Sequence, residues 1–195
     1  MRYSKSVIAL LILFLSATYS VIVNSEVSFD PQFYNFEVKV KSGPYAKNIL
    51  LNSEQEKFST KWKRAMQEQL DKPVNFSGHY RLHTAFGGQG MECMKDNWVC
   101  GWVIDKLTGK VVSELPKDDN GSNIYVDVGD NGTPMGLPFE IDAYKDSTML
   151  VITGQAIPAT SDATDSPICK SVIFNFEGNK FVKIVESIDG CKRDN

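Results

Sequence analysis

The feature that most constrains this chain is the strict alternation of apolar and polar side chains over residues 74–86. A period of two residues is typical of a β-strand with one face on a core and the other in water. Phe76 belongs to the apolar series, whereas His79, Arg81 and His83 belong to the polar one. The pattern therefore predicts a strand with these three residues together on its polar side.

A glycine-rich loop and a hairpin follow this strand. The loop occupies residues 87–101 and contains Cys93 and Cys100, after which extended chain resumes. Gly109 stands where a short hairpin loop requires a positive φ, and Pro116 ends the returning strand because proline cannot donate to a ladder. We expect a strand, a loop closed by cysteines, and a hairpin.

Two runs in this region carry a resemblance. Residues 75–80 read Asn-Phe-Ser-Gly-His-Tyr, and residues 103–111 read Val-Ile-Asp-Lys-Leu-Thr-Gly-Lys-Val. With the Gly- and Cys-containing loop between them, they resemble a pattern in small exported bacterial proteins of unknown function. The resemblance implies a bacterial envelope setting and no particular chemistry.

The N-terminus has the layout of a secretory signal peptide. Arg2 and Lys5 precede an apolar run at residues 7–15, and small or polar residues follow as far as Ser25. Cleavage after Ser25 or after Ser20 fits this layout. We expect a signal peptide at 1–25 and a single β-rich domain at 26–195 that is periplasmic or secreted. The alternative is an uncleaved membrane anchor, because the apolar segment is just long enough to span a thin bilayer.

Charge limits the partners. Removing residues 1–25 lowers Lys+Arg from 21 to 19 against 24 Asp+Glu, which gives a net charge of −5. Nucleic acids and anionic membranes demand clustered Lys and Arg, and the chain has no basic run. We therefore expect a protein or an envelope component as partner, no nucleic acid, and no membrane unless the N-terminal segment stays as an anchor.

One amphipathic helix is predicted near residues 54–70. Ser53 and Glu56 have the spacing of a capping box, and Pro73 lies just beyond the end of the pattern. Apolar residues recur between them at helical spacing: Phe58, Trp62, Ala65, Met66 and Leu70.

The remaining chain favours strands joined mostly by short turns. The expected strands are residues 34–40, 124–128, 139–144, 148–153, 172–176 and 181–186. Residues 149–152 are apolar on both faces, which predicts a central strand. The crossover helices of a parallel sheet are missing. We expect an α+β fold, mostly antiparallel sheet or partial barrel, of about seven or eight strands. Its expected core includes Phe36, Phe58, Trp62, Phe76, Tyr80, Ile104, Val126, Ile141, Val151, Phe174 and Val185.

Four cysteines in an exported chain favour two disulfides over metal ligands, since their spacings fit neither usual zinc pairing. Cys93–Cys100 would close a small loop, and Cys169–Cys191 would tie the ends of the last hairpin. Other pairings and a reactive thiol are the alternatives.

His79 and His83 are the only histidines. On a strand they lie about 13 Å apart at about 3.3 Å per residue, so one ion cannot bind both. We expect no metal and no cofactor. The polar side of the strand is then either an ordinary solvated face or a cationic contact surface.

The function expected from these observations is that of a non-catalytic exported binding protein, for example an inhibitor or an immunity-type factor. Recognition residues often lie on loops held by a rigid scaffold. The candidate binding residues are His79, Arg81, His83, Met91, Met94 and Trp98. In one alternative Trp98 and the methionines fold back to cap the core. In another, the protein is a small periplasmic hydrolase. His79 or His83 would then be its base, oriented by Asp105, Asp127 or Asp142.

Overall fold

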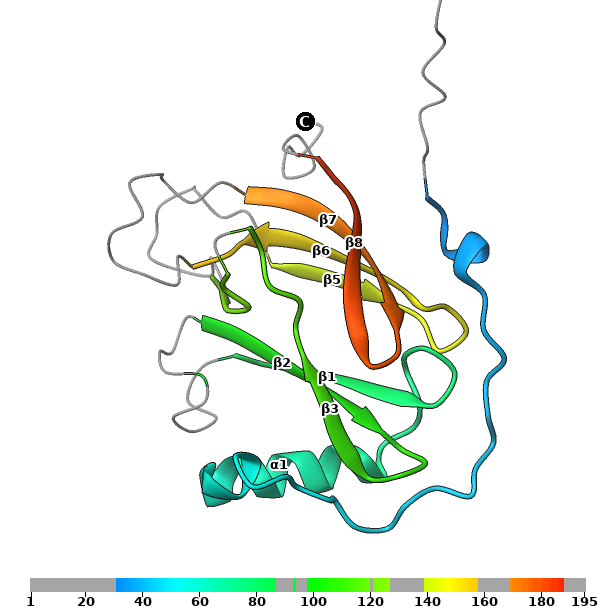
Figure 1. Ribbon diagram of the computed structural model, residues 1–195, viewed down its shortest axis with the longest axis vertical. Helices are drawn as coiled ribbons and strands as arrows, with labels where there is room; N and C mark the ends of the chain where they lie inside the picture. The colour runs from blue at the N-terminus through cyan, green and yellow to red at the C-terminus, as the bar shows by residue number, and fades with distance from the viewer. Residues whose placement is uncertain are drawn as a thin grey trace, which may run out of the picture. The chain divides into compact units, whose positions relative to one another are not determined.

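Two four-stranded antiparallel sheets and one α-helix form the fold (Figure 1), which confirms the predicted α+β class. The strands do not close into a barrel. The computed structural model describes residues 31–86, 93, 98–119, 121–126, 139–157 and 169–187. The predicted signal peptide, Met91, Met94, Asp127 and Cys191 lie outside the described residues.

The first sheet is centred on β2 (Trp98–Asp105). β1 (Tyr80–Phe86) pairs along one edge of β2, from Tyr80 opposite Asp105 to Phe86 opposite Val99. The other edge is shared by β3 (Lys110–Glu114) and β4 (Tyr125–Val126). β3 pairs with the second half of β2, and β4 pairs with Trp98 and Val99 at its start.

The second sheet has the order β5, β6, β7 and β8. Its strands are β5 (Glu140–Ala143), β6 (Met149–Gln155), β7 (Cys169–Glu177) and β8 (Lys180–Ser187). β6 lies between β5 and β7, so the prediction of a central strand at residues 149–152 is confirmed. β8 pairs with β7 alone, and the register between them shifts by one residue at Ile184.

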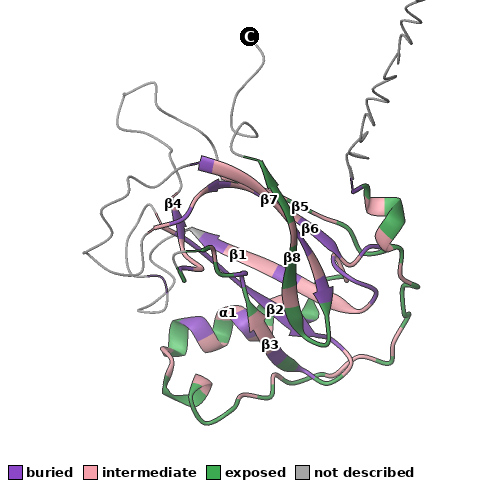
Figure 2. Cartoon of the chain, turned by 45° about the horizontal axis from the view of Figure 1, so that its top comes forward, coloured by how far each residue is buried: buried purple, intermediate pink, exposed green. Residues whose placement is uncertain are grey.

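The two faces of the first sheet are covered differently. Helix α1 (Thr60–Asp71) packs on one face, where Trp62 and Met66 meet Trp102 and Ile104. The second sheet packs on the other face. The core between the sheets contains Phe76, Leu82, Val99, Val103, Leu115, Tyr125, Leu150, Ile152, Phe174 and Phe176. Figure 2 shows exposed residues on β8, on one side of α1 and along the chain that precedes α1.

The helix begins later than the sequence suggests. Its N-cap is Ser59, whose hydroxyl oxygen accepts from the Trp62 N–H at 3.1 Å. The predicted capping box at Ser53 is wrong because the Asn52 side chain accepts from the N–H groups of Glu54 and Gln55. This local turn leads into a short 3-10 helix at Gln55–Lys57 before α1 starts.

Lys106, in the β2–β3 turn, is buried against the end of α1. Its ammonium group donates to the carbonyl of Leu70 and, at 2.6 Å, to that of Lys72. A cation at a helix C-terminus satisfies carbonyls that lack an intrahelical partner and opposes the helix dipole. Burial lowers the pKa of Lys106. The hairpin and the helix end are thereby joined, a contact that the sequence pattern did not predict.

Two predicted strand segments are wrong. Residues 33–36 form a 3-10 helix, and the extended chain after it makes a single bridge, from Glu37 to Ser147. Residues 74–79 precede β1 as a tight turn, in which Ser77 and Gly78 have positive φ. Their N–H groups donate to the carbonyls of Tyr144 and Lys145, and these bonds hold the turn against the β5–β6 connection.

The expected core is confirmed at Trp62, Phe76, Ile104 and Phe174, all of which are buried. It is wrong at Val185, which is 38% exposed on the outer face of β8. Phe36, Val126 and Val151 are only half-buried. Among the described helices, none is both long and apolar enough to cross a membrane.

Candidate functional site

The polar side of β1 is the side on which α1 packs. Arg81 Nε donates to Gln69 Oε1 of the helix at 2.9 Å, and its Nη1 donates to the Pro73 carbonyl at 3.4 Å. The ring of His83 lies 6.4 Å from the ring of Trp102. The interpretation of this side as an open, solvated face is therefore wrong at these positions.

His83 has an unusual environment. Its Nε2 is buried and has no hydrogen-bond partner within the described residues. Burial, with a smaller contribution from the Arg81 charge, lowers the pKa of His83 to about 4. The imidazole is therefore neutral at physiological pH and a weaker base than a free histidine.

His79 comes close to a carboxylate. Its Nε2 lies 3.6 Å from Asp105 Oδ1, which exceeds the length of a hydrogen bond. Asp105 already accepts from the N–H of Leu107 and from the hydroxyl of Thr108, so it organises the β2–β3 turn. Burial lowers the pKa of His79, and Asp105 opposes part of that effect. The turn contacts explain Asp105 without a catalytic role.

The disulfide between Cys93 and Cys100 is confirmed, with a Cα–Cα distance of 5.8 Å. Cys169 is also disulfide-bonded, and the partner expected for it, Cys191, lies outside the described residues. Structural disulfides are typical of oxidising, extracytoplasmic compartments. Trp98 is half-buried and packs against the core between α1 and the first sheet. This position agrees with the alternative in which Trp98 caps the core.

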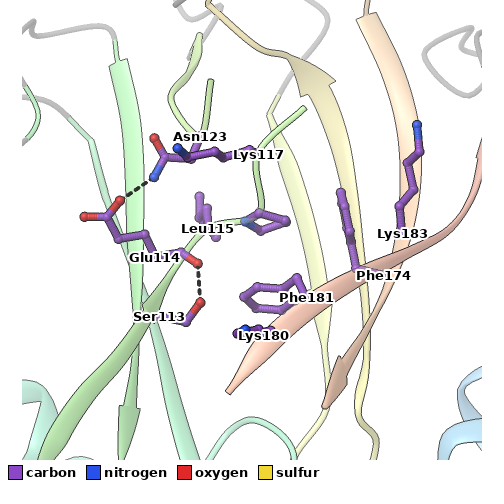
Figure 3. Close-up of a pocket in the computed structure, with 10 residues that line it drawn as sticks. Ser113, Glu114, Leu115, Lys117, Asn123, Phe174, Lys180, Phe181 and Lys183 are labelled. Atoms are coloured by element: carbon purple, nitrogen blue, oxygen red, sulfur yellow. Dashed lines mark hydrogen bonds between the residues drawn. The ribbon is translucent and has the colours of Figure 1, made fainter. Parts of the chain in front are cut away.

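An open cavity lies between the end of β3 and the β7–β8 hairpin (Figure 3). We call it the β3–β8 cleft, and its volume is about 580 Å³. Its lining residues are Ser113, Glu114, Leu115, Pro116, Lys117, Asn123, Phe174, Lys180, Phe181 and Lys183. The sequence did not predict a site here, because the cleft is formed by residues that lie more than fifty positions apart.

The β3–β8 cleft combines an apolar floor with a basic rim. Leu115 and Phe174 are buried, and Phe181 packs against the same core. Lys117, Lys180 and Lys183 are exposed. Figure 3 shows Lys117 near Leu115 and Lys180 near Phe181, whereas Lys183 extends away from them beyond Phe174. Glu114 is the one acidic side chain of the lining, and it accepts from the Asn123 amide at 2.5 Å.

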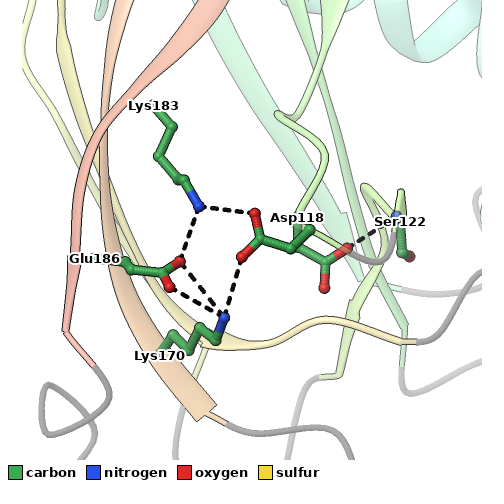
Figure 4. A network of polar contacts seen from close by, with 6 residues as sticks. Asp118, Ser122, Lys170, Lys183 and Glu186 are labelled. Carbon is green, nitrogen blue, oxygen red and sulfur yellow. Dashed lines mark hydrogen bonds and ion pairs between the residues drawn. The ribbon is translucent and has the colours of Figure 1, made fainter. Parts of the chain in front are cut away.

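An ion-pair network links the chain after β3 to the second sheet (Figure 4). Asp119 accepts from Lys183 at 2.7 Å and from Lys170 at 3.3 Å, and both lysines also contact Glu186. The bond from Lys183 is the main cause of the lowered pKa of Asp119. The network lies beside the cleft, and its acidic groups pair with Lys183. Lys117 and Lys180 form the basic rim of the cleft.

A second, smaller cavity lies on the other face of the first sheet. We call it the α1-side cleft. Its volume is about 260 Å³, and Phe58 and Trp102 supply its apolar wall. Its other lining residues are Asn52, Glu54, Gln55, Val111, Val112, Ser113 and Glu114. Neither this cavity nor the β3–β8 cleft contains His79 or His83.

The known proteins offer no guide to the site. No family model matches the sequence, and neither the curated proteins nor the solved structures include a significant match. Within the described part of the chain, no three His, Cys, Asp or Glu side chains cluster closely enough to hold a metal ion.

Proposed function

We propose that this chain is a non-catalytic exported binding protein that holds a partner protein or an envelope component in the β3–β8 cleft. The observation that carries the proposal is a cleft of about 580 Å³ that has an apolar floor and the exposed Lys117 and Lys180 on its rim. Pockets that bind small ligand groups commonly have volumes of about 300 to 1,000 Å³ and combine apolar walls with a few polar groups. The lining has three cationic groups and one acidic group, in a chain whose net charge is −5 without residues 1–25.

The cleft is better suited to binding than the polar side of β1, where the sequence places the site. Arg81 is engaged by Gln69 of α1, so a partner would have to replace that contact, and His83 is half-buried beside Trp102. The β3–β8 cleft is open without any rearrangement, because its rim residues are exposed. The role expected for Met91, Met94 and Trp98 in binding stays a separate prediction.

Site-specific photo-crosslinking tests the proposal. A photoreactive phenylalanine analogue replaces Lys117 in the cleft, or Glu68 on the exposed side of α1 as a matched surface control. After irradiation with bacterial envelope extract, we expect adducts from position 117 and not from position 68. Lys180→Glu should reduce the adducts from position 117, whereas Lys145→Glu, the same charge change in the β5–β6 turn, should not. Equal adducts at both positions, or none at either, would overturn the proposal.

A further inference from the structure

The end of β3 is an open sheet edge. β3 pairs with β2 on its inner side. On its outer side Leu50 forms a bridge with Lys110, and Gln55 Nε2 donates to the Val111 carbonyl at 3.0 Å. Among the described strands, none pairs with residues 112–114 on that outer side, where the Glu114 carbonyl accepts only from the Ser113 hydroxyl, at 2.9 Å, among the hydrogen bonds of the described residues. Unpaired backbone groups at a sheet edge are a template for pairing with another extended chain.

A cleft lies on each face of this open edge. The β3–β8 cleft is on the face toward the second sheet, since Leu115 and Phe174 in its lining belong to the core between the sheets. The α1-side cleft is on the opposite face, since Phe58 and Trp102 pack with the helix. Ser113 and Glu114 line both cavities, so the open edge runs between them.

This arrangement matches the geometry of an added strand. Neighbouring strands lie about 4.8 Å apart, and successive side chains of a strand point to opposite faces. A segment paired with residues 112–114 would therefore send one set of alternate side chains into each cleft. In strand addition, main-chain hydrogen bonds supply affinity and pockets for alternate side chains supply specificity.

The two clefts differ in charge. Lys117 and Lys180 form the basic rim of the β3–β8 cleft, whereas Lys183 of its lining is paired with Asp119 and Glu186. The acidic groups of the α1-side cleft are Glu54, which pairs with Lys57 at 2.8 Å, and Glu114, which lines both clefts; its lining contains no cationic residue. Complementary charge at an interface favours one register and suppresses others. The side chains of an added strand should accordingly alternate between acidic or apolar on one side and basic or apolar on the other.

We infer that the ligand of this protein is an extended segment of a partner polypeptide, added as a strand to the open edge of β3. Its acidic and apolar side chains enter the β3–β8 cleft, and its alternate basic or apolar side chains enter the α1-side cleft. The inference rests on the proposed function and specifies the partner class for the same site.

Selection of peptides from a random seven-residue display library on the intact mature protein tests the inference. We expect the enriched peptides to carry Asp or Glu at every second position. A synthetic copy of the most enriched peptide should bind at least about tenfold more tightly than the same peptide N-methylated on alternate backbone nitrogens, which is about 1.4 kcal/mol. Enrichment without a two-residue period, no enrichment, or equal binding of the methylated peptide would overturn the inference.

Protein variants locate the binding. Lys117→Glu and Lys180→Glu should each lower the affinity of the protein for the synthetic peptide several-fold. Lys145→Glu should leave that affinity unchanged. Circular dichroism of each variant checks that the fold is kept. If position 117 gives cleft-dependent crosslinks but the library yields no alternating peptide, the proposed function stands and the strand-addition inference is wrong. If both experiments fail, both proposals fall.

Discussion

The two sheets share one core but differ in what covers their outer faces. In β2 every residue after Trp98 is buried, because α1 covers one face and the second sheet covers the other. In β8 no residue is fully buried, and Val182 is 50% exposed. Figure 2 shows the same contrast between β2 and β8.

The difference between β2 and β8 shows how the covering of a strand's two faces is related to its pattern of apolar residues. A strand covered on both faces is apolar throughout, and a strand covered on one face alternates. β1 departs from this rule, since Arg81 and His83 lie on the face that the helix covers. Polar residues on a strand therefore do not identify a solvent face when a helix supplies partners such as Gln69.

The largest expected effect tests whether α1 is essential to the first sheet. Trp62 is fully buried and makes edge-on ring contacts with Phe58 and Trp102. Trp62→Ala should lower the free energy of unfolding by about 3 to 5 kcal/mol, because the cavity cannot fully collapse. Val182→Ala on the open face should change it by less than about 0.5 kcal/mol. Urea unfolding with the disulfides intact measures both, and similar values for the two variants would contradict the comparison.

The next prediction compares the hairpin turns of the two sheets. Gly109 and Gly178 both have positive φ, so an alanine at either position costs about 1 to 2 kcal/mol in backbone strain. A Cβ at Gly109 would lie 2.3 Å from the Asn48 carbonyl oxygen, whereas a Cβ at Gly178 meets nothing within 4 Å. Gly109→Ala should therefore cost about 1 to 3 kcal/mol more than Gly178→Ala. Thermal and urea unfolding of the two variants check the difference, and equal losses would show that the segment over Gly109 moves aside easily.

The sequence predicts the elements better than their ends. The hairpins β2–β3 and β7–β8 follow from alternation and from glycine at the turns, and β5–β6 follows from the polar residues 145–147 between two strand patterns, because these signals are local. The predicted start of β1 was wrong because the chain turns at Ser77 and Gly78, whose N–H groups donate to carbonyls of the β5–β6 connection. Such long-range bonds leave no periodic signal in the sequence. The predicted start of α1 was wrong because the Asn52 side chain stabilises a separate turn that leads into the 3-10 helix at Gln55–Lys57.

The candidate site was much less predictable than the fold. In the sequence, Phe181 and Lys183 belong to an ordinary strand pattern in β8. Leu115 precedes a proline at the end of β3, and neither pattern indicates a binding site. Only the packing of the two sheets brings these residues into one cleft. The Cys93–Cys100 disulfide was predictable because the pair closes a short loop in a chain expected to be exported.

A pH titration examines the covered face of the first sheet. The pKa of His83 is about 4 in the folded protein and about 6.5 when unfolded, so the unfolded state binds the extra proton between these values. The contribution of His83 to the free energy of unfolding is fully present above about pH 6.5 and decreases as the pH falls toward about 4. The limiting slope is about 1.4 kcal/mol per pH unit, and partial exposure keeps the real slope smaller. His83→Phe should flatten the pH dependence of unfolding in this window relative to His79→Asn, and identical profiles would contradict the assignment.

The smallest effect concerns the contact between the sheets outside their core. Asp119 lies between β3 and β4 of the first sheet, and Lys183 and Lys170 belong to the second, so their ion pairs join the two at the surface. Exposed pairs contribute about 0.2 to 1 kcal/mol, because water screens the charges and long side chains lose entropy when they are held. A double-mutant cycle of Asp119→Asn and Lys183→Met should give a coupling free energy in that range, and the coupling should shrink at about 1 M salt, where the screening length is about 3 Å. A coupling above about 2 kcal/mol that salt does not reduce would mean that the network holds the sheets together. The buried side chains of Leu82, Val103 and Phe174 would then contribute less to their association than their burial implies.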